Sequence, residues 1–137
     1  METTGGCFCG AILYTAEFDE RRVGICHCRD CQIFSGSAFR MAAIAAPGSF
    51  TITKGEPRAF DKTADNGNVR RMLFCGACGT HLASAPSDPD APGAFVSIRV
   101  ATCVDFAQLE PAGELWCRSR LPWMPELAGT VKVDGQR

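Results

Sequence analysis

Seven of the nine cysteines in this chain lie in three short clusters, and thiolate sulfur is a preferred ligand of Zn²⁺. The clusters are Cys7-Phe8-Cys9, Cys26-His27-Cys28-Arg29-Asp30-Cys31 and Cys75-Gly76-Ala77-Cys78-Gly79. Because side chains alternate in an extended segment, each C-x-C pair is expected to point its two sulfurs the same way. A C-x-x-C segment folds back so that both sulfurs can reach one ion, and the glycines of the third cluster fit that turn. The clusters therefore predict metal binding.

Seven thiolate ligands divide most simply into a closed site of four and an open site of three. A structural zinc takes four protein ligands, whereas a catalytic zinc takes three and keeps one position open. Pairing the two-cysteine clusters with each other gives the closed site. Its ligands would be Cys7, Cys9, Cys75 and Cys78, and those of the open site would be Cys26, Cys28 and Cys31. The count alone does not assign clusters to sites. His27 lies between two ligands on an extended segment, so we expect it to face away from the metal.

Two other uses of clustered cysteines compete with zinc: a redox dithiol and an iron–sulfur cluster. Two C-x-x-C and two C-x-C spacings in one short chain favour metal ligation over redox chemistry. The odd number of cysteines resists complete pairing in disulfides. The start of the chain, Met1 to Cys7, has neither the basic nor the apolar region of a secretory signal. We therefore expect a cytoplasmic protein, in which thiols stay reduced.

Length and composition predict one ordinary globular domain over residues 1–137, because 46% of the residues are hydrophobic and 21% are charged. The formal net charge of −1 gives no reason to expect a nucleic acid or an anionic membrane as partner. The longest candidate apolar run, residues 42–46, is far too short to span a membrane. The oligomeric state cannot be predicted from the sequence.

Short apolar segments separated by turn signals favour a mostly β fold. Strands are expected at residues 11–15, 38–46, 50–53, 69–74 and 95–100. Helical turns are expected only at 31–34 and 105–109, with Asp105 as the cap of the second. The Pro-, Gly- and Asp-rich residues 86–93 predict a surface loop. Cys103 and Cys117 lie in apolar surroundings and are interpreted as core residues.

Beyond these patterns, the chain resembles the glutathione-dependent formaldehyde-activating enzyme family. Gly5-Gly6-Cys7-Phe8-Cys9-Gly10 is similar to that family's opening G-x-C-x-C-G, and the second cluster followed by Ser35-Gly36-Ser37 is similar to its C-H-C-x-x-C motif. Phe74-Cys75-Gly76-Ala77-Cys78-Gly79-Thr80 is similar to the family's F-C-x-x-C-G-T motif. Leu121-Pro122-Trp123 also has a counterpart in many members, so the resemblance covers roughly residues 3 to 125.

The resemblance implies a mostly antiparallel β fold of the Mss4-like type, with zinc knuckles and few helical turns. It also implies two Zn²⁺ ions per chain, the structural one at the closed site and the second at the open site named above. The family's activity joins glutathione and formaldehyde into S-hydroxymethylglutathione and is classed as that of a carbon–sulfur lyase. It therefore implies glutathione or another small thiol as partner.

Several residues near the open site are candidates for contacting the substrate. Ser35, Ser37 and Arg40 follow the second cluster and could bind a carboxylate or position a thiol, although the serines could instead satisfy turn backbone and Arg40 could face solvent. His81 follows the last knuckle and could transfer a proton or act as a structural hydrogen-bond donor. Trp123 could form the wall of a pocket or pack in the core.

Three functions remain open at this stage. The first is a zinc enzyme that acts on a thiol adduct, with Cys26, Cys28 and Cys31 acting through their metal. The second is a protein that binds glutathione or another thiol without turnover. The third is a zinc-stabilised interaction domain, which the absence of charged or disordered extensions makes less favoured.

Overall fold

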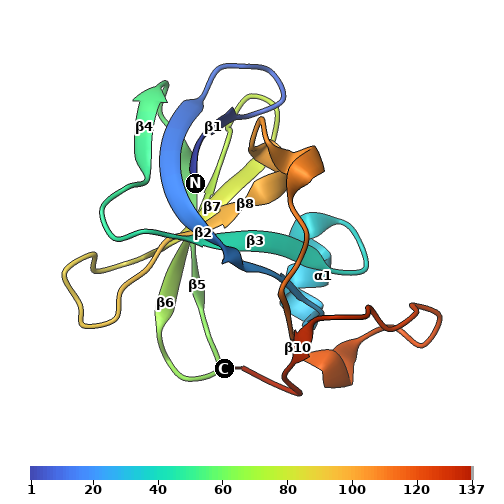
Figure 1. Ribbon diagram of the computed structural model, residues 1–137. Coiled ribbons are helices and arrows are strands. Elements are labelled where there is room, and N and C mark those ends of the chain that lie inside the picture. Colours follow the sequence, from blue (N-terminus) through green and yellow to red (C-terminus); the bar gives the residue numbers. More distant parts are fainter. Residues whose placement is uncertain (137) are drawn as a thin grey trace.

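A single long strand, β2 (Leu13–Cys26), connects the two sheets of the computed structural model, which describes residues 1–136 (Figure 1). Its first half alternates buried and exposed side chains, with Tyr14, Ala16 and Phe18 buried. The exposed residues 19–22 then interrupt the pairing of β2 with β3, and the register shifts between Phe18 and Val23. This irregularity lets one strand belong to both sheets, because a bulge bends a strand and increases its twist.

The first half of β2 pairs antiparallel with β1 (Glu2–Gly6) and β4 (Thr51–Lys54). The second half pairs antiparallel with β3 (Arg40–Ala45) and parallel with β9 (Gly113–Leu115). The larger sheet has the strand order β10-β9-β2-β3-β8-β7-β6-β5. Its remaining strands are β5 (Arg58–Thr63), β6 (Val69–Phe74), β7 (His81–Pro86), β8 (Ser97–Arg99) and β10 (Val131–Lys132).

The hydrophobic core lies between these two sheets. Tyr14, Ala16 and Phe18 from β2 pack in one cluster with buried residues of the larger sheet, such as Ile98 and Leu82. Cys7 and Cys75 belong to the same cluster, so the first and third cysteine motifs border directly on the core. The core therefore fixes the backbone from which these sulfurs project.

Helical structure is short. The helix α1 (Arg29–Ser35) starts at the second cysteine cluster and ends at Gly36, whose φ of 65° is the left-handed conformation typical of a helix end. Three 3₁₀ turns follow later, at Val100–Thr102, Phe106–Gln108 and Cys117–Ser119. Figure 1 shows α1 beside β3, next to the larger sheet.

The mostly β fold expected from the sequence is confirmed, and the five expected strands overlap β2, β3, β4, β6 and β8. The sequence reading missed β1, β5, β7, β9 and β10, and it took the first residues of β2 for a short strand. Asp105 occupies the N-cap position of the expected turn at 105–109, which is a 3₁₀ turn at Phe106–Gln108. Its carboxylate makes no capping hydrogen bond and instead accepts one from the Thr3 hydroxyl at 2.8 Å. The two parallel pairs that involve β9 also depart from an all-antiparallel sheet.

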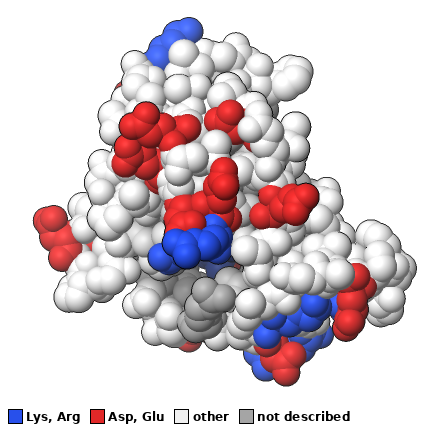
Figure 2. All heavy atoms as spheres, in the orientation of Figure 1, with Lys and Arg blue, Asp and Glu red and all other residues white. Residues whose placement is uncertain are grey.

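Acidic and basic side chains are scattered over the face of the described residues that Figure 2 shows, without one dominant basic surface. None of the helices within residues 1–136 has the length and apolar character needed to cross a membrane.

Candidate metal centres

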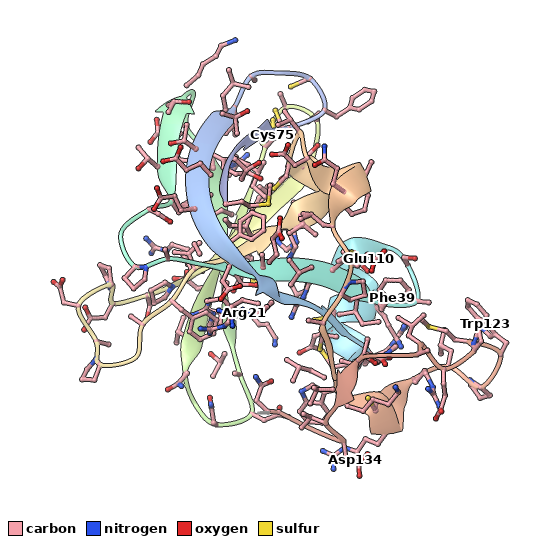
Figure 3. All side chains as sticks on the ribbon, in the orientation of Figure 1. Arg21, Phe39, Cys75, Glu110, Trp123 and Asp134 are labelled. Atoms are coloured by element: carbon pink, nitrogen blue, oxygen red, sulfur yellow. The ribbon has the colours of Figure 1, made fainter. Side chains whose placement is uncertain are left out.

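The first centre joins two turns that are far apart in the chain. The sulfurs of Cys7, Cys9, Cys75 and Cys78 all lie within 4.8 Å of one another. Cys7 and Cys9 belong to the turn between β1 and β2, and the other two to the turn between β6 and β7, where Figure 3 labels Cys75. The grouping is the one expected for the closed site.

Backbone geometry explains why both turns bring their sulfurs together. In the first, Gly10 N–H donates to the Cys7 carbonyl at 3.1 Å, so Cys7-Phe8-Cys9 is a tight turn. The expectation of an extended C-x-C segment is therefore wrong here, and the turn itself makes the sulfurs converge. In the second, Gly79 N–H donates to the Cys75 carbonyl at 2.8 Å with a φ of 79° at Gly79, a conformation that favours glycine.

Spacing between the sulfurs fits a tetrahedral metal. The Cys7 and Cys9 sulfurs are 3.6 Å apart, and those of Cys9 and Cys75 are 3.8 Å apart. Four sulfurs at about 2.3 Å from one zinc would lie roughly 3.8 Å from each other. A disulfide needs sulfurs at about 2.05 Å, so these are free thiols held at ligand spacing. The four residues could therefore hold a metal ion such as zinc.

Hydrogen-bond donors point at three of the four sulfurs of the first centre, whereas at Cys9 the effect of the Ala11 N–H is outweighed by neighbouring sulfurs, which raise the pKa of the thiol to about 11. Ile12 N–H donates to the Cys7 sulfur at 3.3 Å, and Cys78 N–H donates to the Cys75 sulfur at 3.4 Å. The Thr80 hydroxyl lies 3.1 Å from the Cys78 sulfur, and this contact lowers the pKa of the Cys78 thiol to about 5. Donors aimed at a sulfur stabilise its charged form, which is the form that binds metal.

The second centre is built from six consecutive residues. The sulfurs of Cys26, Cys28 and Cys31 also lie within 4.8 Å of one another. Cys26 ends β2, Cys28 is the extended residue that caps α1, and Cys31 lies in the first turn of that helix. Cys31 N–H donates to the Cys28 sulfur at 3.3 Å. The group offers three ligands, so a metal held by it keeps a position for another molecule.

Basic residues gather beside this second centre. Contacts with the other two sulfurs, and after them the positive charge of Arg40, lower the pKa of the Cys31 thiol. Burial lowers the pKa of Arg99 to about 9, with a further lowering from the nearby charge of Arg40. Burial and then the charge of Arg99 lower the pKa of His81 to about 4, so this imidazole is neutral at pH 7. The positive charge therefore acts on Cys31, whereas contacts with neighbouring sulfurs raise the pKa of the Cys26 thiol.

Of the residues expected to contact substrate, Arg40 and His81 lie beside the second centre. The charge of Arg40 acts on the Cys31 thiol, and the charges of Arg99 and Cys31 act on the His81 imidazole. His81 stacks on Phe34 of α1, with ring centroids 5.3 Å apart. Its Nδ1 has no hydrogen-bond partner in the described part of the chain. The role of structural hydrogen-bond donor is therefore not supported at that nitrogen.

The serines and Trp123 behave differently from these two. The Ser35 hydroxyl donates to the Phe39 carbonyl at 3.1 Å, which is the turn-stabilising alternative, and Ser37 is exposed. Trp123 is 71% exposed on the C-terminal loop, away from the labelled Cys75, and is therefore not a core residue (Figure 3).

A buried polar pair supports the second centre from the opposite side. His27 faces away from the three sulfurs, as expected, and its Nε2 donates to Glu114 Oε1 at 2.9 Å. Both side chains are essentially inaccessible to solvent. Cys117 lies next to this pair and is only half-buried, so its interpretation as a core residue is wrong, whereas Cys103 is buried.

Sequence reasoning missed Arg70, Arg99 and Glu114 as members of the site region. Arg99 lies on a segment whose alternating pattern marks it as the polar, outward-facing position. Glu114 is one acidic residue in a turn-rich segment, and nothing local distinguishes it.

Comparison with known proteins agrees with the cysteine geometry. The family model described as glutathione-dependent formaldehyde-activating enzyme matches residues 2–119. An uncharacterised lyase of Schizosaccharomyces pombe is 32% identical over 81 residues, which are 59% of this chain and 56% of that protein. The match thus spans little more than half of the relative. A crystal structure of a Rhodobacter sphaeroides protein is similar in fold, with a TM-score of 0.55 and 20% identity over 72% of this chain and 85% of that one. This chain belongs to the glutathione-dependent formaldehyde-activating enzyme family.

Proposed function

We propose that the chain is a zinc enzyme of the carbon–sulfur lyase type, which forms or cleaves the bond between a small thiol and a carbonyl carbon. The thiol is glutathione or a related compound, and the adduct is of the S-hydroxymethylglutathione type. Family membership and the lyase name of the yeast relative support the reaction class. The single observation that carries the proposal is the three-sulfur group at Cys26, Cys28 and Cys31, set among basic side chains.

The two centres have separate roles in this proposal. The four-cysteine group holds a structural zinc, because it offers a complete tetrahedral set. Cys26, Cys28 and Cys31 would hold the second zinc, which would supply acidification of a coordinated thiol at neutral pH. Three thiolates already offset the charge of the ion, which favours sulfur chemistry over hydrolysis by bound hydroxide.

The protein's own residues then position the reacting groups. Arg40 lies beside Cys31, where its positive charge favours an incoming thiolate. His81 is neutral at pH 7, so one ring nitrogen can accept a hydrogen bond from the hydroxyl of the adduct. In the cleavage direction the hydroxyl proton passes to the His81 nitrogen and from there to solvent, the carbonyl forms, and the electron pair of the carbon–sulfur bond returns to sulfur as a thiolate.

The test begins with metal content. Freshly purified protein is expected to contain close to two zinc ions per chain by plasma mass spectrometry. Iron in place of zinc, or no metal, would refute the assignment. The activity assay then follows adduct formation from glutathione and formaldehyde against the uncatalysed reaction, because the two combine spontaneously.

A matched pair of cysteine variants separates the enzyme from a thiol-binding protein. Cys31→Ser is expected to retain the fold and lose the rate above background, whereas Cys103→Ser, outside both sulfur groups and the His27–Glu114 pair, is expected to keep it. Thiol binding with no rate above background in the unchanged chain would favour the binding protein instead. Full activity in Cys31→Ser would refute the role of the second centre.

A further inference from the structure

Three arginines lie on one face of the larger sheet, next to the second cysteine centre. Arg40 of β3 pairs with Cys26 of β2, and Arg99 of β8 pairs with Ala42, two residues further along β3. Residues two apart on a strand share a face, so these side chains lie on the same side. Arg70 of β6 reaches this face as well, since its Nε donates to the Ser84 hydroxyl at 2.9 Å and Ser84 pairs with Ser97 of β8.

Arg99 is buried without an anionic partner. The residue is 8% exposed, and its Nε has no hydrogen-bond partner within residues 1–136. Its Nη1 reaches only the Ser97 carbonyl and hydroxyl, at 3.4 and 3.3 Å. Arg40 Nε is likewise buried and unpartnered in the described chain. Burial of a guanidinium costs folding free energy unless an anion or good acceptors bind it. These donors are therefore available to bind an acceptor from another molecule.

The charges nearby do not balance. The carboxylate of Asp30 on α1 is already paired with Lys62 of β5, at 2.8 Å. Three thiolates on one Zn²⁺ leave a single negative charge, which is less than the charge of the three arginines. His81 is neutral and contributes none. An anion is therefore the missing partner, and a planar guanidinium matches a carboxylate through paired hydrogen bonds.

We propose that Arg99 and Arg40, with Arg70 on the same face, form a subsite that binds a carboxylate of the substrate beside the second centre. The inference rests on the proposed function for the identity of the reacting sulfur, and it adds that arginine side chains hold a carboxylate of the adduct next to that sulfur. The carboxylate can belong to the thiol or to the carbonyl compound. Both sources present the same chemistry to the arginines, so the test has an arm for each.

Equilibrium binding to the zinc-loaded full chain provides the test, in a buffer free of carboxylate and phosphate. The thiol arm compares mercaptoacetate with 2-mercaptoethanol by isothermal titration calorimetry, and the carbonyl arm compares glyoxylate with glycolaldehyde. The acidic probe of at least one pair is expected to bind about tenfold or more tightly than its neutral counterpart, as one charge-assisted pair warrants. The arm that shows this preference identifies the component that carries the carboxylate.

Variants then assign the preference to the arginines. Arg99→Gln is expected to remove it, and Arg40→Gln to reduce it severalfold. Arg71→Gln is the matched control, because Arg71 is next to Arg70 but points outward and pairs with Asp61 at 3.1 Å. Circular dichroism and zinc content report on folding. Should Arg99→Gln fail to fold, Arg40→Gln carries the test, since Arg40 is only half-buried.

The outcomes separate this inference from the proposed function. No carboxylate preference in either arm, or a preference that survives in the folded arginine variants, would overturn the subsite. An arginine-dependent preference without turnover would support the subsite and count against the lyase. Turnover that is indifferent to a carboxylate would support the lyase and overturn the subsite.

Discussion

The imidazole of His27 donates a hydrogen bond of 2.9 Å to Glu114, and neither side chain has measurable solvent exposure. The carboxylate also accepts from the Thr130 hydroxyl and lies 3.4 Å from Lys132 Nζ. Since His27 stands between Cys26 and Cys28, this buried pair anchors the second centre to β9 and to the C-terminal segment. Because His27 is flanked by two of the three cysteines, fixing its side chain also fixes the backbone from which those sulfurs project.

Replacing Glu114 by glutamine should destabilise the protein and loosen the second centre. Glu114→Gln keeps the shape but removes the charge that faces His27 and Lys132, and breaking a buried charged network of this kind costs about 2 to 4 kcal/mol. Urea unfolding measures the free energy of unfolding, and a chromogenic chelator measures the rate of zinc release. Glu110→Gln, at an exposed position, is the control. Unchanged unfolding in Glu114→Gln would contradict the anchoring role.

The two metal centres should differ sharply in their effect on stability. Cys78→Ser removes a ligand from the group that joins the β1–β2 turn to the β6–β7 turn, and we expect a loss of about 3 kcal/mol or more. Cys31→Ser affects a group confined to residues 26–31 and should cost clearly less. Thermal unfolding followed by circular dichroism compares them. Equal losses would show that the second centre is also structural.

Acidification should destabilise the folded chain partly through His81. Burial and the charges of Arg99 and Arg40 hold the pKa of His81 at about 4, well below the ordinary histidine value of 6.5. Between pH 6.5 and pH 4 the unfolded chain binds this proton more readily than the folded chain, so the free energy of unfolding falls as pH falls. After allowance for partial exposure, the loss at pH 5 is about 1 kcal/mol, and it is absent at pH 8.

The His81→Asn variant isolates this contribution. Zinc-saturated samples of both proteins are unfolded in urea at pH 8 and pH 5, so that protonation of the thiolates affects the two alike. The free energy of unfolding should fall between pH 8 and pH 5 by about 1 kcal/mol less in His81→Asn than in the unchanged protein. An identical pH dependence in both proteins would contradict the depressed pKa.

Gly5 should not tolerate a side chain, although it precedes the metal ligands by two positions. A Cβ at Gly5 would lie 2.4 Å from the ring and hydroxyl of Tyr14 and 2.6 Å from the Thr102 carbonyl. Gly5→Ala is expected to lower the free energy of unfolding by about 2 kcal/mol or more, because the packed ring has to move. Gly135→Ala, where the nearest atom is 3.8 Å away, is the control. Equal stability of the two variants would contradict the close approach.

The cysteine groups could be predicted from the sequence because ligand chemistry depends on residue type and short spacing. The missed strands lacked the apolar alternation on which strand prediction relies: β1 has no large apolar residue, and every residue of β5 except Lys62 is exposed. The alternation of residues 95–100 correctly places the side chains of Arg99 and Ile98 on opposite faces of their strand. It could not show that α1 and the β5–β6 hairpin border the face on which Arg99 lies. Burial of Arg99 is a property of the assembled sheet and helix.

The two cysteine groups also differ in how much of the chain must exist before each can assemble. The three cysteines of the second group lie within residues 26–31, so their sulfurs can meet as soon as that segment is synthesised, before β9 supplies Glu114. The first requires contact between sulfurs separated by 66 positions, and closing so long a loop is entropically expensive and slow. During translation the sulfurs of the second group can therefore come together before those of the first, and Cys7 and Cys9 stay unpaired thiols until the third motif is made.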